Sequence, residues 1–193
     1  MTRLVLMGPP GVGKGTQARI ISEKLGIPAI STGQIFRTNM AQGTELGVVA
    51  NQYISQGRFV PDSVTNPMVA ARLSSPDVAE GFLLDGYPRN LDQAHALRDM
   101  LASQDAKLDV VIDINAPHDV LVEHMVHRAQ IEGRTDDSPE VFAERLHEYH
   151  RKTEPVSTYY ADQDLLEVVD GVGTIEEVSG RVFAVLQART VAV

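Results

Sequence analysis

The sequence contains no cysteine, and this absence excludes several kinds of chemistry at once. Without thiols the chain cannot form disulfides and cannot use a cysteine as a nucleophile. It also cannot build a structural zinc site from cysteine ligands. We therefore expect no structural zinc and no thiol-dependent reaction.

Long apolar runs are absent as well. No stretch approaches the ~20 apolar residues that a membrane-spanning helix requires, and the run after Arg3 is too short for the core of a signal peptide. The chain of 193 residues predicts a single domain, 1–193, large enough to bury a substantial core. We expect it to act in the cytoplasm, without a membrane partner.

Positive charge is scarce, because 17 basic residues face 26 acidic ones and the formal net charge is -9. This balance argues against nucleic acid as a partner, since surfaces that bind nucleic acid are normally basic. Only four of the basic residues are lysines. Arginine suits bidentate contacts to phosphate, so the bias indicates a focused site for anions. A GC-rich genome also favours arginine over lysine. The positions of the arginines must therefore decide whether they form an anion site.

The most informative segment that is present is a glycine-rich loop, Gly8-Pro9-Pro10-Gly11-Val12-Gly13-Lys14-Gly15-Thr16. It lies between an apolar strand-like run, Leu4 to Met7, and a helical pattern that begins at Thr16. Such a loop directs backbone N–H groups and the positive end of a helix dipole at one point. Lys14 can then reach the outer phosphates of a nucleotide. The hydroxyl stands at Thr16, one residue later than in the strict motif, which indicates a subclass of phosphate-binding loops.

Strand-like and helix-like segments alternate along the rest of the chain. This alternation predicts an α/β fold with a parallel sheet covered on both faces, and such sheets bind ligands at the carboxyl ends of their strands. The predicted strands are 3–7, 27–30, 81–84, 109–114 and 165–169.

Two stretches interrupt the alternation, and we predict both as insertions over the binding edge. Residues 31–60 carry two short helical patterns, after which Pro61 ends a segment and Asp62 can cap the next helix. Residues 128–137 read as a short polar break between helices.

Side chains suited to phosphate chemistry follow the predicted strands. Asp85 ends an apolar strand, a position at which a carboxylate can hold water and Mg²⁺ beside a phosphate loop, although it could also cap a turn. A lone arginine on a helix usually lies on a solvated face. Here, however, several occur on segments that converge on one edge of the sheet: Arg37, Arg89, Arg128, Arg134 and Arg145.

In these motifs the sequence resembles the bacterial adenylate kinases with a short lid, and the resemblance extends over essentially its whole length. The resemblance implies a three-layer P-loop kinase fold with a five-stranded parallel sheet flanked by helices. It implies a core of residues 1–30, 61–127 and 138–193, a mobile flap of residues 31–60 that binds the monophosphate, and a lid of residues 128–137. The segments that carry it are the G-K-G-T end of the loop, 30–33, 57–62, 82–89, 133–137, 145–146, 153–155 and 169–171.

The resemblance also implies a role for each matching residue. Lys14, Arg89, Arg134 and Arg145 would neutralise the transferring phosphoryl group, and Arg37 would grip the phosphate of AMP together with Arg89. ATP would be held by Gly11, Val12, Gly13, Lys14, Gly15 and Thr16, with Arg128 against the adenine and Gly173 offering its backbone. AMP would be held by Thr32, Arg37, Arg58, Phe59, Val60, Gly86, Tyr87, Pro88, Arg89, Gln93, Arg134 and Arg145, with Gln93 reading the adenine.

The reaction implied is reversible transfer from ATP to AMP, giving two ADP without a covalent intermediate, by a monomer. Mg²⁺ would accompany ATP, held mainly by nucleotide phosphates and water, with Thr16 and Asp85 nearby. No general base is required, because a phosphate monoester is already largely dianionic at pH 7 with a second pKa near ~6.

Two departures from the family pattern and three alternatives belong beside this hypothesis. Gln34 stands where an acidic residue is common, and Glu132 stands where some relatives carry arginine. A UMP or CMP kinase of the same fold is disfavoured by the hydroxyl of Thr32. A regulatory GTPase would need an Asn-Lys-x-Asp segment, which this sequence does not contain. A catalytically weak nucleotide sensor is the third alternative.

Overall fold

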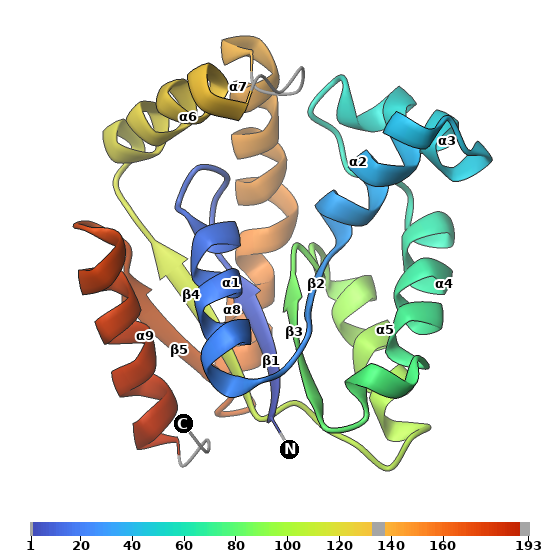
Figure 1. Ribbon diagram of the computed structural model, residues 1–193, viewed down its shortest axis with the longest axis vertical. Coiled ribbons are helices and arrows are strands. Elements are labelled where there is room, and N and C mark those ends of the chain that lie inside the picture. The colour runs from blue at the N-terminus through green and yellow to red at the C-terminus, as the bar shows by residue number, and fades with distance from the viewer. Residues whose placement is uncertain (1, 133–137, 190–193) are drawn as a thin grey trace.

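A central parallel sheet organises the protein, as Figure 1 shows for the computed structural model, which describes residues 2–132 and 138–189. The strand order is β2-β3-β1-β4-β5, and every neighbouring pair is parallel. The first strand of the chain therefore lies in the middle of the sheet. The strands are β1 (Thr2–Met7), β2 (Ala29–Ser31), β3 (Gly81–Asp85), β4 (Val110–Asn115) and β5 (Leu166–Asp170).

The five predicted strands are confirmed, with small shifts at their ends. The largest shift is in β2, which begins at Ala29 rather than at residue 27. Pro28 has no N–H to donate to a ladder, although its carbonyl accepts from the Leu83 N–H at 2.9 Å.

Helices cover both faces of the sheet, giving three layers. Buried side chains of α1, α6, α7 and α9 pack with one face of the sheet, and those of α4, α5 and α8 pack with the other. The bounds are α1 (Lys14–Leu25), α2 (Thr32–Gln42), α3 (Glu45–Ile54), α4 (Asp62–Leu73), η1 (Pro76–Val78), α5 (Leu91–Ala102), α6 (His118–Glu132), α7 (Pro139–Glu148), η2 (Tyr149–Thr153), α8 (Glu154–Ala161) and α9 (Ile175–Ala188).

The pair α2 and α3 forms a small lobe with a core of its own. Phe36, Ala50 and Val60 are its buried centre, and these residues belong to neither of the two clusters that line the sheet. Figure 1 shows the lobe standing beyond the edge of the sheet toward which the strands point. The two helical patterns predicted within residues 31–60 are therefore present.

Two local expectations were wrong. The polar break was expected from Arg128, but α6 continues to Glu132, because Arg, Ala, Gln, Ile and Glu all support a helix and polarity alone does not end one. The rest of the expected lid, residues 133–137, lies outside the described residues. Asp62 does not cap α4 with its side chain; it is the first residue of that helix, and Pro61 occupies the N-cap position.

No helix in residues 2–132 and 138–189 has the length and apolar character needed to cross a bilayer.

Candidate functional site

The glycine-rich loop joins the central strand β1 to α1. Gly13 is the N-cap of α1 with φ 92, a left-handed conformation that glycine adopts without strain. The side chain of Val12 is buried in the core and anchors the loop. Lys14 turns back across the loop, donating to the carbonyls of Gly8 at 2.7 Å and Pro9 at 2.8 Å. The lysine ammonium thus lies against the backbone of the loop itself.

Burial changes the protonation of Lys14. The pKa of Lys14 is lowered from 10.5 to about 8, mainly by desolvation; Arg89 and Arg145 contribute to the lowering, and Asp85 and Asp113 oppose it. Asp85 and Asp113 lie on β3 and β4, Arg89 follows β3, and Arg145 lies on α7. The lysine therefore lies in a cluster of cations with two carboxylates nearby.

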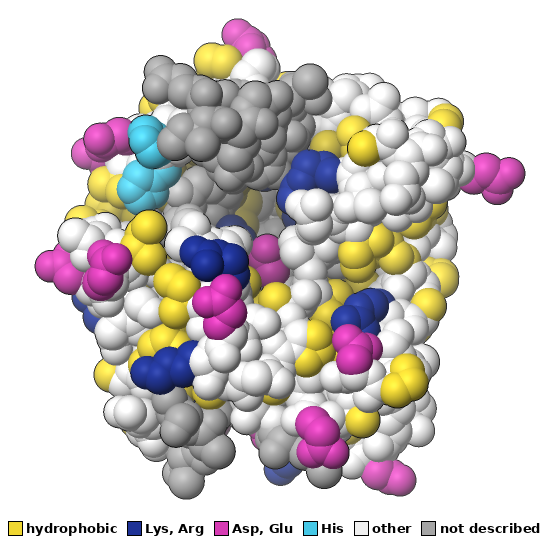
Figure 2. All heavy atoms as spheres, viewed as in Figure 1, with side chains coloured by type: hydrophobic (Ala, Val, Ile, Leu, Met, Phe, Trp, Pro, Cys, Tyr) yellow, Lys and Arg dark blue, Asp and Glu magenta, His cyan; other side chains and the backbone are white. Residues whose placement is uncertain are grey.

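A pocket opens beside this loop, between the α2–α3 lobe and the sheet. Figure 2 shows the molecule hollowed at this place, with basic side chains on the wall of the hollow. The pocket is lined by Thr32, Gly33, Phe36, Arg37, Ile54, Gly57, Arg58, Phe59, Val60, Thr65, Gly86, Arg89, Gln93 and Arg145. The structure thus brings together most of the residues that the sequence assigned to AMP.

Arg89 occupies the side of this pocket nearest the phosphate loop. Its Nε donates to the Gly86 carbonyl at 2.8 Å, and its own carbonyl accepts from the Thr153 hydroxyl at 2.8 Å. Burial lowers its pKa to about 10, and Arg145 and Arg37 add to the shift while Asp85 opposes it. Several cations therefore face one space, and a phosphate dianion would relieve their repulsion.

Gln93 is held by a network that sequence reasoning did not predict. It is only 1% exposed. Its Nε2 donates to Asp62 at 2.6 Å, and its Oε1 accepts from the Arg89 N–H at 2.8 Å. Asn90 caps α5 and donates to both oxygens of Asp62. An asparagine three residues before the N3 position is a common N-cap signal, but no sequence pattern indicates the contact with Asp62.

Thr32 is buried at the start of α2, and its hydroxyl donates to the Gly86 carbonyl at 2.8 Å. Because the proton is used in this bond, the oxygen remains available to accept a hydrogen bond from a ligand.

Two of the residues predicted to hold AMP lie elsewhere. Tyr87 and Pro88 do not line the pocket: the Tyr87 ring is in the core, and its hydroxyl donates to Asn66 at 2.8 Å. Arg128 lies on the last turns of α6, and Arg134 falls outside the described residues.

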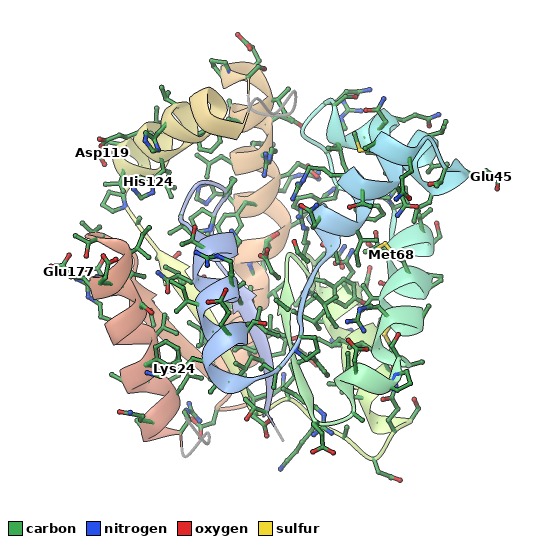
Figure 3. All side chains as sticks on the ribbon, in the orientation of Figure 1. Lys24, Glu45, Met68, Asp119, His124 and Glu177 are labelled. Atoms are coloured by element: carbon green, nitrogen blue, oxygen red, sulfur yellow. The ribbon has the colours of Figure 1, made fainter. Side chains whose placement is uncertain are left out.

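The loop after β5 contains Gly173 and borders the opposite side of the phosphate loop. Arg181 donates to the carbonyls of Asp170 at 2.8 Å and Val172 at 2.6 Å, and Gln17 donates to Ile175 at 3.1 Å. The sequence did not predict these hydrogen bonds. On α6, which Figure 3 marks at His124, the ring Nδ1 lies 3.0 Å from the Gly11 carbonyl.

The expected metal-associated residues lie beside the loop. Asp85 ends β3 and accepts from the Ser31 hydroxyl at 3.1 Å, and Thr16 is in the first turn of α1. In the part of the chain that the structure describes, no group of three or more His, Asp or Glu could hold a metal ion on its own.

Comparison with known proteins gives concordant results. The family model "Adenylate kinase" matches residues 6–165. A protein of Pseudarthrobacter chlorophenolicus named adenylate kinase is 51% identical over 97% of this chain and 98% of its own length. Proteins of the same name from Thermobifida fusca and Bifidobacterium longum are 48% and 50% identical, over 97% and 96% of this chain and 99% and 100% of their own.

Proposed function

Because the chain belongs to the adenylate kinase family and is a phosphotransferase that acts between ATP and AMP, we propose that transfer takes place where the phosphate loop meets the Arg89 pocket. One observation carries this proposal. Arg89 and Arg145 each lower the pKa of Lys14, and Arg145 also lowers that of Arg89. The donor and acceptor sides thus share one group of cations, which two phosphates brought end to end would neutralise.

Positioning and charge neutralisation account for the reaction. The acceptor oxygen of AMP attacks the γ-phosphorus, and the bond from that phosphorus to the bridging oxygen of the departing ADP breaks in line with it. Lys14, Arg89 and Arg145 hold the charge that spreads over the equatorial oxygens. AMP arrives as a dianion, so no side chain needs to remove a proton.

Thr32 and Gln93 support adenine as the acceptor base. The Thr32 oxygen can accept a hydrogen bond, which suits the exocyclic amino group of adenine. Gln93 reads the base in this proposal by exchanging one of its present partners, Asp62 or the Arg89 N–H, for the ligand.

Mg²⁺ accompanies ATP in this proposal, and the residues present fit such an ion. A single half-buried carboxylate, Asp85, and the hydroxyl of Thr16 suit an ion held mainly by nucleotide phosphates and water. When bound, the ion neutralises charge on the phosphate oxygens.

We further propose that residues 31–60 and 128–137 close over the nucleotides and exclude water, which would otherwise hydrolyse ATP. The buried cluster of Phe36, Ala50 and Val60 is distinct from the two clusters that line the sheet, and it supports movement of the first segment about its contacts with α4. Both nucleotide sites are built within one chain, which supports action as a monomer, and we place it in the cytoplasm by analogy with the family.

The test is ADP formation from Mg-ATP with AMP, GMP, UMP and CMP offered separately, with Lys14→Met as the inactive control. We expect transfer to AMP, and a loss of about 10²–10³-fold in the variant, as when one preorganised donor is removed. Preference for UMP or CMP would overturn the acceptor assignment. Nucleotide binding without transfer would favour a sensor.

A further inference from the structure

The aromatic ring of Phe59 lies against two cations. Its centroid is 4.9 Å from the Arg89 guanidinium and 5.5 Å from the Lys152 ammonium. Phe59 belongs to the segment between α3 and α4, Arg89 follows β3, and Lys152 is in η2. The ring thus connects the segment that leaves the α2–α3 lobe with two elements of the core.

Lys152 is itself held in place. It forms an ion pair with Glu148 at 2.6 Å, and Glu148 is buried and also pairs with Arg151. One of the two cations on the ring therefore has a carboxylate partner.

Arg89 has a different environment. Arg145 and Arg37 repel it, and Asp85, the last residue of β3, attracts it. Within residues 2–132 and 138–189, the Arg89 side chain is fixed by the hydrogen bond from Nε to the Gly86 carbonyl. The ring of Phe59 supplies a second contact, because the negative face of an aromatic ring attracts a guanidinium without using its N–H donors. Those donors can then point at a ligand.

The backbone just before Phe59 packs against helix α7. At Gly57, which has φ +74, an added Cβ would lie 2.7 Å from the Val141 carbonyl, so this backbone packs directly on α7. The segment 57–60 is thus fixed at one end by α7 and at the ring by Arg89 and Lys152.

We propose that Phe59 is a positioning residue for the acceptor phosphate: its ring orients the Arg89 guanidinium so that the N–H groups face AMP. The inference rests on the proposed function, because it concerns the arginine assigned to AMP. It makes the aromatic ring of Phe59 itself the functional group.

The experiment compares Phe59→Leu, which keeps an apolar side chain but removes the ring, with Phe59→Tyr, which keeps the ring. For Phe59→Leu we expect KM for AMP to rise about fivefold to thirtyfold, the range of a desolvated cation–π contact. KM for ATP and the melting temperature should change little. Phe59→Tyr should restore KM for AMP to within about twofold of wild type.

A matched control is available at Phe183, whose ring lies 4.3 Å from the Lys24 ammonium. Phe183→Leu also removes a cation–π contact, but on α9, and should leave both KM values unchanged. In an Arg89→Ala background, Phe59→Leu should add little further loss, because the partner of the ring is gone.

Three outcomes would overturn the inference: an unchanged KM for AMP in Phe59→Leu, an equal rise for ATP and AMP, or a Tyr variant as impaired as the Leu variant. If wild type fails to transfer to AMP, the proposed function fails instead. Calorimetric titration of AMP into the same variants then still tests the role of the ring.

Discussion

Lys14 combines a half-buried position, packed against its own loop, with the need to carry a charge. Its pKa of about 8 means that the free protein begins to lose this proton just above neutral pH. Between pH 8 and the usual pKa of 10.5, the unfolded chain binds more protons at this residue than the folded one, so the contribution of Lys14 to stability rises with pH in that window. Binding of phosphate has the opposite preference, because an anion favours the protonated lysine.

We therefore expect ATP binding to weaken as the pH rises through about 8. At pH 9 the dissociation constant should be about tenfold larger than at pH 7, since only about one tenth of the free lysine remains protonated. Calorimetric titration at both pH values measures this change.

Two controls accompany this titration. AMP binding should stay constant over the same range, because the Arg89 pKa is about 10. Lys14→Met should remove the pH step for ATP. An ATP affinity equal at pH 7 and pH 9 in wild type would contradict the assignment.

Arg89 gives a second prediction, based on its place on the acceptor side. Arg89→Ala should weaken AMP binding by about 10–100-fold, because it removes a charge-assisted contact to phosphate, while ATP binding should change by much less. Arg19→Ala, at an exposed arginine paired with Glu23, controls for the loss of one positive charge. Equal losses for both nucleotides would show that the two sites are not separate.

The α2–α3 lobe and its connection to α7 allow a test with two matched glycines. Gly43 and Gly57 have similar φ values, +65 and +74, but only Gly57 has a close neighbour, the Val141 carbonyl. Both Gly→Ala changes should cost about 1 kcal/mol in backbone strain. Only Gly57→Ala should also separate the 57–60 segment from α7.

Thermal unfolding and KM for AMP measure these two effects separately. We expect both variants to have a lower melting temperature. We expect KM for AMP to rise about tenfold for Gly57→Ala alone, which corresponds to a contact between the 57–60 segment and α7 that contributes ~1.4 kcal/mol to AMP binding. Indistinguishable KM values would mean that this contact does not matter for acceptor binding.

Local patterns made much of this architecture predictable. The strands of a parallel sheet are continuous apolar runs, and a glycine loop between a strand and a helix commonly binds phosphate. The Asp62–Gln93 contact was not predictable, because it spans 31 residues and depends on how α4 packs against α5.

The end of α6 and the π turn η2 also escaped prediction, for reasons that are local. Helix formers continue past Arg128, so the polar composition there was misleading. At η2, Pro155 has no N–H for the Arg151 carbonyl, and the chain opens into a wider turn in which the Glu154 N–H donates to the Tyr149 carbonyl. This turn carries Lys152 and Thr153, which contact Phe59 and Arg89.

The phosphate loop and the Arg89 pocket are neighbours in this proposal. A ligand that occupies both should therefore stabilise the folded protein strongly against heat. A dinucleotide in which five phosphates join two adenosines should bind the folded chain and not the unfolded chain. At 1,000 times its dissociation constant it should add ~4.1 kcal/mol to the free energy of unfolding, which raises the melting temperature by about 8–16 °C. The measurement is a thermal scan with ATP alone and AMP alone, each at the same concentration as the dinucleotide, as comparisons; a shift no greater than that with ATP would argue against adjacent sites.

The central place of β1 has a consequence for how the protein is made. β1 is synthesised first, but it pairs with β3 and β4, whose residues 81–85 and 110–115 leave the ribosome much later. At ~5–20 residues per second, the phosphate loop therefore waits several seconds for both neighbouring strands. During this time the nascent chain cannot be stabilised by nucleotide, and its apolar first strand is exposed to chaperones.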